Sequence, residues 1–267
     1  MIKLVALDLD DTLLNSKLKI SPETAAAVRS AVELGVTVTF ATGRMYSSAL
    51  PYARELGLDV PLITYQGALM KTSNSQEVLY NKPVPMDLAR EILSFAAEEG
   101  LDVNMYLEDS LYVRSGNSSI NEYVKLARVP YKAVPDLAEV MVSEPHKLLI
   151  VASPGKIDRL AAELQERWEG KLHLTKSKPY FLEFTHPAAT KGQAIDSLAA
   201  ELGIGREEIM AVGDSYNDLD MIDYAGVGVA MGNAVQEIKD RADYVTRGNN
   251  EHGVAEAIRR FVLEAQR

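Results

Sequence analysis

Residues 3–16, KLVALDLDDTLLNS, place three carboxylates directly after a run of apolar side chains. The apolar residues leave no polar face, which predicts a buried strand over residues 3–9. A single aspartate after a strand often only ends a loop or caps a helix. Asp8, Asp10 and Asp11 instead crowd three like charges at a place where the loss of hydration is costly. We therefore expect a compensating cation here, held partly by residues from elsewhere in the chain.

The overall composition is that of an ordinary globular protein. The chain has 267 residues, of which 47% are hydrophobic and 25% charged, enough for one large or two medium domains. The formal net charge of −10 disfavours nucleic acid or an anionic membrane as a partner. The sequence has no cysteine, which excludes disulfides and a cysteine nucleophile. The apolar run at the N-terminus is short and no run reaches membrane length, so we expect a cytoplasmic protein.

Strands and helices alternate along most of the chain. The first helix has Ser21 as its N-cap, Pro22 at its first position and Gly35 beyond its end. Such alternation is typical of an α/β fold with a Rossmann-like, doubly wound, mostly parallel sheet covered by helices on both faces. The expected strands are 3–9, 36–44, 60–69, 209–215 and 226–234, with helices at 21–34, 45–57, 190–203 and 216–225 and a terminal strand and helix after 243.

The sequence pattern changes between Asn81 and Phe184. Strand-like stretches there are joined by short turns, as in VNMYLEDSLYVRS, which predicts an antiparallel α+β unit. The alternative is that this part merely extends the parallel sheet. We expect residues 1–81 and 185–267 to form the core, with residues 82–184 as an inserted α+β cap domain.

Candidate site residues follow several of the predicted strands. In an open parallel sheet, ligands bind outside the carboxyl ends of the strands. Segments that are far apart in sequence would therefore bring carboxylates, a hydroxyl, a glycine turn and cations to one edge. We expect a site for a metal and a phosphate there. Its residues are Asp8 and Asp10 after the first strand, Thr42, Gly43 and Arg44 after the second, Asp214 after a late strand, and Lys191 at the start of a helix.

This set of groups suits phosphoryl chemistry. A hard cation such as Mg²⁺ takes carboxylate and phosphate oxygens, so it would let a phosphate approach Asp8 and Asp214. Lys191 suits contact with Asp8 and a phosphoryl oxygen, while Thr42 and nearby backbone amides can donate hydrogen bonds to phosphate. Asp8 is then the candidate nucleophile. Asp10 is the candidate acid and base that protonates the leaving oxygen and later takes a proton from water.

Four stretches resemble the motifs of the haloacid dehalogenase-like phosphatases. They are DLDDTLL, ATGR, TKG and GDSYNDLDMI, in this order along the chain. The insertion before Lys191 and the later GVAMGNA resemble the Cof-type branch, which carries a large class-two cap. The resemblance covers essentially the whole chain. It implies Mg²⁺-dependent hydrolysis of phosphomonoesters through an aspartyl-phosphate on Asp8, with Asp10 as the acid and base.

The resemblance also implies a metal site, and the sequence departs from the family pattern at one position. It implies that the Asp8 carboxylate, the backbone carbonyl of Asp10 and Asp214 hold the metal. Asn217 and Asp218 would support these ligands. The chain has YQGA where this branch often has NGA, so no substrate contact can be carried over to Gln66.

Three functions fit these residues. The first is a phosphatase for small phosphorylated metabolites, such as sugar phosphates or phosphorylated cofactors. The second is a phosphotransferase or phosphomutase with the same aspartyl-phosphate chemistry, and the third is a non-enzymatic sugar-phosphate sensor. The intact set of acidic residues and Lys191 argues against the sensor, and we favour hydrolysis. The sequence names neither the substrate, nor the cap residues that contact it, nor the oligomeric state.

Overall fold

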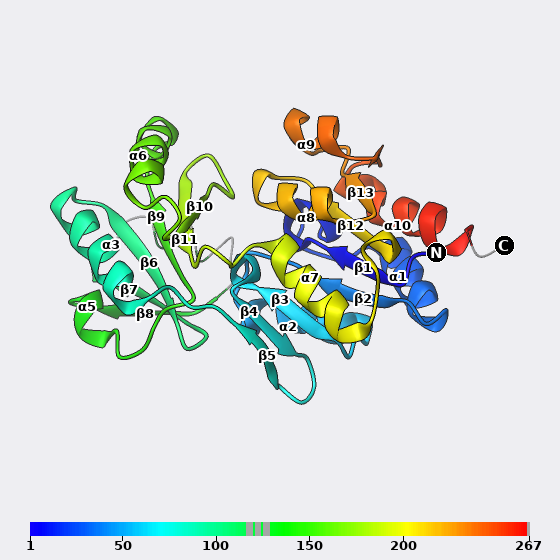
Figure 1. The fold of residues 1–267 in the computed structure, drawn as a ribbon, viewed down its shortest axis with the longest axis horizontal. Coiled ribbons are helices and arrows are strands. Elements are labelled where there is room, and N and C mark those ends of the chain that lie inside the picture. Colours follow the sequence, from blue (N-terminus) through cyan, green and yellow to red (C-terminus); the bar gives the residue numbers. More distant parts are fainter. Residues whose placement is uncertain (116–119, 121–123, 125–128, 266–267) are drawn as a thin grey trace.

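Two separate sheets dominate the computed structural model, which describes residues 1–265 except 116–119, 121–123 and 125–128. Figure 1 shows a body on the right that holds the blue start of the chain together with its yellow and red end. The green middle of the chain forms the body on the left. A five-stranded sheet lies in the first body and a six-stranded sheet in the second.

A parallel sheet forms the centre of the first body. Across the sheet, its strands are β14 (Tyr244–Val245), β13 (Val227–Ala230), β12 (Ile209–Gly213), β1 (Leu4–Leu7) and β2 (Thr37–Phe40). Every neighbouring pair is parallel. All residues of β1 and β12 are buried, as a parallel sheet covered on both faces requires. The predicted doubly wound α/β core is confirmed.

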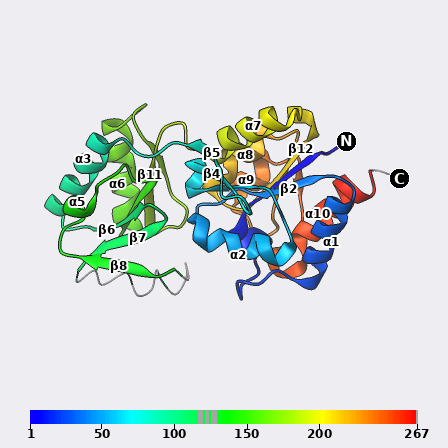
Figure 2. The same ribbon diagram turned by 90° about the horizontal axis from the view of Figure 1, so that it is seen from below.

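Helices cover both faces of this sheet. They are α1 (Pro22–Glu33), α2 (Tyr46–Leu56), α7 (Lys191–Leu202), α8 (Leu219–Tyr224), α9 (Gln236–Arg241) and α10 (Gly253–Ile258). Figure 2 shows α7 and α8 on one side of the sheet and α1 and α10 on the other. Shorter helical turns lie at Leu9–Leu13, Arg206–Glu208, Tyr216–Asp218, Asn249–Glu251 and Arg259–Leu263. As predicted, Ser21 caps α1 by accepting a hydrogen bond from the amide of Thr24 at 3.2 Å.

The predicted strand over residues 60–69 is broken in its middle. The chain forms β3 (Pro61–Thr64), a turn at Tyr65–Gly67, β4 (Leu69–Thr72) and β5 (Val78–Asn81), which make a small antiparallel sheet. The prediction of one strand was wrong because Tyr65, Gln66 and Gly67 all have positive φ, at 52°, 63° and 100°. Residue 67 has to be glycine, since a Cβ there would lie 2.2 Å from the backbone oxygen of Thr190.

The second body is an α+β unit built on a mixed sheet. Across the sheet, its strands are β10 (His173–Thr175), β11 (Phe181–Thr185), β9 (Lys147–Val151), β6 (Asp102–Leu107), β7 (Ser110–Arg114) and β8 (Tyr131–Val134). All neighbouring pairs are antiparallel except β7 and β8. The sheet shares no strand with the parallel sheet among the described residues. The predicted boundaries after residues 81 and 184 remain predictions, and β11 runs one residue past the second of them.

The cap sheet, as we call this six-stranded sheet, has two different faces. Helices α3 (Met86–Glu98), α5 (Leu137–Val140) and α6 (Pro154–Arg167) lie on one face and share a hydrophobic cluster with Val103, Met105 and Leu107 of β6. Tyr106 belongs instead to the hydrophobic cluster of the core, because side chains alternate along a strand. The other face of the cap sheet is therefore directed at the core. No helix in the described part of the chain is long and apolar enough to cross a membrane.

Candidate active site

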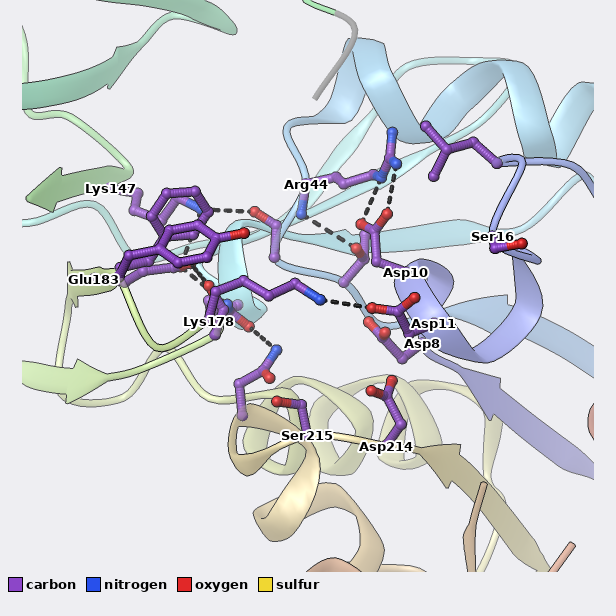
Figure 3. A pocket seen from close by; sticks show the side chains of 18 of the residues that line it. Asp8, Asp10, Asp11, Ser16, Arg44, Lys147, Lys178, Glu183, Asp214 and Ser215 are labelled. Atoms are coloured by element: carbon purple, nitrogen blue, oxygen red, sulfur yellow. Dashed lines mark hydrogen bonds and ion pairs between the residues drawn. The ribbon is translucent and has the colours of Figure 1, made fainter. Parts of the chain in front are cut away.

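A cavity of about 410 Å³ lies at the carboxyl ends of β1, β2 and β12, between the core and the cap sheet. Figure 3 shows acidic side chains on its core side and residues of β9 and β11 on its cap side. Asp8, Asp10, Thr42, Arg44 and Asp214 all line it. The structure therefore brings the predicted residues together, as the rule for parallel sheets requires.

Lys191 joins two carboxylates beneath the cavity. It opens α7, and its Nζ lies 2.6 Å from Asp8 Oδ1 and 2.6 Å from Asp218 Oδ1. The side chains of Lys191 and Asp218 are completely buried, and that of Asp8 is 8% exposed. Charge partners explain why a buried lysine is tolerated here, and they raise its pKa although burial alone would lower it. Lys191 thus fixes the position of the Asp8 carboxylate.

Three carboxylates form a site that fits a cation. Asp8, Asp214 and Asp218 each offer an oxygen within 4.8 Å of the others. Asp218 Oδ1 accepts from Lys191 and its Oδ2 accepts from the amides of Asp214 and Ser215 at 2.9 and 3.0 Å. Asp218 therefore already accepts three hydrogen bonds, whereas Asp8 and Asp214 each accept one side-chain hydrogen bond and are the carboxylates more open to a metal.

The electrostatics of Asp8 and Asp214 favour the binding of a cation. Burial raises the pKa of Asp8 to about 7, with Lys191 opposing the shift and the charges of Asp218 and Asp10 adding to it. Burial, Asp218 and Asp8 raise the pKa of Asp214 to about 8. Two carboxylates that resist ionisation at neutral pH are the ligands that a hard divalent cation would neutralise. The residues therefore fit the predicted metal.

Thr12 holds one of these carboxylates. Its hydroxyl donates a hydrogen bond to Asp214 Oδ1 at 2.8 Å, and its side chain is almost fully buried. It follows the acidic stretch directly, but it was not among the predicted site residues. A hydroxyl inside the DLDDT motif, one residue after the last carboxylate, was the available signal.

Thr12→Val is expected to weaken metal binding without removing it. The substitution keeps the shape of the side chain but removes the donor that orients Asp214, and loss of such a partner typically costs about 10- to 100-fold in metal affinity. The measurement is the Mg²⁺ concentration that gives half-maximal activity. Thr37→Val on β2 is the matched control and should leave this concentration unchanged. Equal values for Thr12→Val and the wild type would contradict a role for the hydroxyl at the metal.

Asp10 faces a different partner from Asp8. Its two oxygens accept from Arg44 Nε and a terminal nitrogen of Arg44 at 2.7 and 2.6 Å. The guanidinium also donates to Ser48 Oγ at 3.0 Å. The side chain of Arg44 is only 7% exposed while that of Asp10 is 39% exposed. Such a two-pronged pair fixes the orientation of a carboxylate, so Arg44, predicted to bind phosphate, here holds Asp10.

Thr42 and Gly43 line the cavity between these carboxylates and the cap. The Thr42 hydroxyl oxygen accepts from the amide of Arg44 at 3.2 Å, which leaves its O–H to donate toward the cavity. Gly43 is packed closely, because a Cβ there would lie 2.5 Å from Gln66 Nε2. The predicted phosphate loop thus runs directly beside Gln66.

Gln66 and Asn217 connect the core to the cap. Asn217 Nδ2 donates to Gln66 Oε1 at 3.0 Å, and Gln66 Nε2 donates to Glu183 Oε2 at 2.9 Å. Asn217 was predicted to support the metal ligands, but its side-chain amide donates to Gln66 instead. The backbone of Gln66 is left-handed, with φ of 63°. From there its side chain is long enough to reach both Asn217 and Glu183.

Three charged residues of the cap, Lys147, Lys178 and Glu183, were not predicted from the sequence. Lys147 Nζ lies 3.0 Å from Glu183 Oε2, and Lys178 Nζ lies 2.6 Å from Asp11 Oδ2. All three line the cavity, and so does Asp11. A signal existed for two of them, because Lys147 opens the apolar run KLLIV and Glu183 interrupts the apolar run YFLEF. Single charges in buried strands are rare without a partner.

Known proteins share both the sequence and the fold. The chain is 34% identical to 5-amino-6-(5-phospho-D-ribitylamino)uracil phosphatase YcsE from Bacillus subtilis, over 98% of this chain and 96% of that protein. It is 31% identical to phosphatase YwpJ of the same organism, over 97% of this chain and 100% of the relative. The chain also resembles the crystal structure of a haloacid dehalogenase-like hydrolase from Bacteroides thetaiotaomicron, with a TM-score of 0.88 and 33% sequence identity. The match covers 97% of this chain and 99% of the chain in that structure.

The sequence profile of one family spans nearly the whole chain. It matches residues 5–258, a range that contains the core motifs and the complete cap sheet. The structural likeness has the same extent. The chain belongs to the haloacid dehalogenase-like hydrolase family.

Proposed function

We propose that the protein is a Mg²⁺-dependent phosphatase that hydrolyses small phosphorylated metabolites through an aspartyl-phosphate on Asp8. The observation that carries the proposal is the arrangement around Asp8: its carboxylate is held by Lys191 at 2.6 Å and lies beside Asp214 at a cavity edge. The relatives named as phosphatases support the reaction type. Sugar phosphates and phosphorylated cofactors are the candidate substrates.

Each residue then has a role in the reaction. Asp8 attacks phosphorus, and Lys191 holds the attacking carboxylate and faces the charge that develops on the phosphoryl oxygens. Asp10, held by Arg44, donates a proton to the leaving oxygen and takes one from the water that later hydrolyses the aspartyl-phosphate. Thr42 donates a hydrogen bond to a phosphoryl oxygen.

The metal would be held by Asp8 and Asp214, together with the backbone carbonyl of Asp10. Bound Mg²⁺ would neutralise the carboxylates and the charge of the phosphate. Asp218 and Thr12 act on this site indirectly, through their hydrogen bonds to Lys191, the Asp214 amide and the Asp214 carboxylate. Asn217 would act on the site through the hydrogen bond that it donates to Gln66.

We also propose that residues 82–184 act as a cap domain over the residues 1–81 and 185–267 of the core. Contacts between the two parts support this placement of the cap, because Lys147 Nζ donates to the carbonyl of Gly43 at 2.8 Å and Asp109 accepts from the amide of Ser47 at 3.0 Å. Closure of this kind excludes bulk water while the phosphoryl group is on the enzyme. A cytoplasmic location stays a prediction.

Release of inorganic phosphate from p-nitrophenyl phosphate with added Mg²⁺ tests the proposal. A phosphatase should turn over many times with water as the acceptor. A phosphomutase should release little phosphate and instead move it between hydroxyls of a sugar phosphate, and a sensor should do neither. Stoichiometric phosphate release with repeated turnover would support hydrolysis, whereas its absence in a folded, Mg²⁺-loaded protein would overturn it.

A further inference from the structure

The cap side of the cavity is built on a buried ion pair. Lys147 on β9 and Glu183 on β11 lie 3.0 Å apart, with side chains that are 3% and 4% exposed. Glu183 also accepts hydrogen bonds from Gln66 at 2.9 Å and from Ser177, and Lys147 donates to the carbonyl of Gly43. Burial alone would raise the pKa of Glu183, but Lys147 and the hydrogen bonds from Ser177 and Gln66 outweigh it and hold the pKa below its usual value. The pair is therefore charged on both sides and neutral as a unit.

The other cations of the cavity are also paired. Arg44 lies 2.6 Å from Asp10, and Lys178 lies 2.6 Å from Asp11. With Lys147, these are the lysines and arginines among the described residues that line the cavity. Each of them already has a carboxylate within 3.0 Å. A substrate with a second anionic group would therefore meet no unpaired cation among them.

The position of Lys178 separates two ends of the cavity. Figure 3 shows Lys178 reaching toward Asp11, with Lys147 and Glu183 on its cap side and Asp8 on its core side. The core end would take the phosphoryl group under the proposed function. The cap end, with Lys147 and Glu183, is then left for the leaving group.

The rest of the lining offers both polar and apolar contacts. Ser177 and Asn217 present a hydroxyl and an amide, while Leu18, Tyr180 and Phe181 present apolar surface. The rings of Tyr180 and Phe181 pack edge to face, with their centroids 4.5 Å apart. Polyols and sugars carry hydroxyl groups together with apolar C–H surface, so they match such a mixed lining.

We propose that the Lys147–Glu183 pair selects leaving groups without a second negative charge, so that the preferred substrates are monophosphates of neutral polyols or sugars. This inference rests on the proposed phosphatase function. An anionic leaving group would lose its hydration at the cap end of the cavity and would find no unpaired cation there in return, which is unfavourable. The charge on Lys147 cannot compensate, because Glu183 already neutralises it.

The test uses two substrates that differ in one group. D-Sorbitol 6-phosphate and 6-phospho-D-gluconate share their chain and phosphate, but the first ends in a hydroxymethyl group and the second in a carboxylate. The ratio of their kcat/KM values should be at least about tenfold in favour of sorbitol 6-phosphate in the wild type. p-Nitrophenyl phosphate is measured in parallel as the general phosphomonoester.

Glu183→Gln should reduce this preference. The variant keeps the side-chain size but leaves the charge of Lys147 uncompensated, so the ratio should fall by at least about tenfold. Glu208→Gln is the matched control, because Glu208 forms an ion pair with Lys3 at 2.7 Å and neither residue lines the cavity. The control should keep the wild-type ratio. The wild-type ratio decides the proposal even if Glu183→Gln does not fold.

The possible failures are distinguishable. Hydrolysis of p-nitrophenyl phosphate without hydrolysis of sorbitol 6-phosphate would overturn the inference and leave the phosphatase function in place. So would equal kcat/KM values for the two substrates, or a folded Glu183→Gln variant with the wild-type ratio. Failure of all three compounds to release phosphate would overturn the proposed function and the inference together.

Discussion

Asp8→Asn is expected to lower kcat by at least about 10⁴-fold, because an amide cannot attack phosphorus and the reaction loses its nucleophile. The fold should survive. Lys191 keeps Asp218 at 2.6 Å, and the amide oxygen of an asparagine can still accept its hydrogen bond. Burial already disfavours the charged form of Asp8 and raises its pKa to about 7, so a neutral side chain is tolerated at this position.

Two measurements belong together in this experiment. Phosphate release from p-nitrophenyl phosphate reports the activity, and thermal unfolding confirms that the variant is folded. Asp223→Asn provides the matched control, since Asp223 pairs with Arg241 on the surface and does not line the cavity. Its activity should equal that of the wild type. Activity near the wild-type level in folded Asp8→Asn, shown by mass spectrometry to be free of deamidation, would refute Asp8 as the nucleophile.

The core of the site could be predicted from the sequence because its geometry follows from local rules. Asp8 and Asp214 come directly after apolar runs, and these runs become neighbouring parallel strands, β1 and β12. Carboxyl ends of parallel strands share one edge, which places both residues together without any knowledge of distances. Lys191 joins them because it starts the helix that follows the inserted unit.

The cap side could not be predicted in the same way. Glu183 is paired across the sheet with Leu149 of β9, and this register depends on long-range strand pairing rather than on local pattern. The contact with Lys147 follows from that register. The left-handed turn at Tyr65 and Gln66 was also unreadable, since neither residue type favours positive φ and only Gly67 gives a local signal. The orientation of Asp10 toward Arg44 depends on the side-chain rotamer, which the spacing of residues along the sequence does not determine.

Removal of the metal is expected to lower activity by at least about 10³-fold, because the carboxylates and the phosphate would repel each other without it. Assays in a chelator, followed by addition of excess Mg²⁺, measure the loss and its recovery. Excess Ca²⁺ should suppress the activity, since its larger and looser shell lets Asp8 bind through both oxygens and thereby blocks attack. Full turnover in the chelator would exclude a metal role.

The same carboxylates make the metal requirement depend on pH. Asp8 and Asp214 have pKa values raised to about 7 and about 8, and a metal must displace their protons. The Mg²⁺ concentration for half-maximal activity should therefore rise as the pH falls from 8 to 6. Thr12→Val, which removes a hydrogen bond that lowers the pKa of Asp214, should make this rise steeper.

The stability of the metal-free protein should change with pH in the direction opposite to its metal affinity. Between their unfolded value of 3.8 and the raised folded values, the folded state binds protons that the unfolded state has lost, so the free energy of unfolding falls as the pH rises. The decline should level off above about pH 8, where both groups are ionised in both states. Urea unfolding at pH 6 and pH 8 measures it, once in chelator and once in saturating Mg²⁺. Mg²⁺ should stabilise the protein more at pH 8 than at pH 6, because it then meets two carboxylates that have already lost their protons. Equal stabilisation at the two pH values would mean that Asp8 and Asp214 are not the groups that bind the metal.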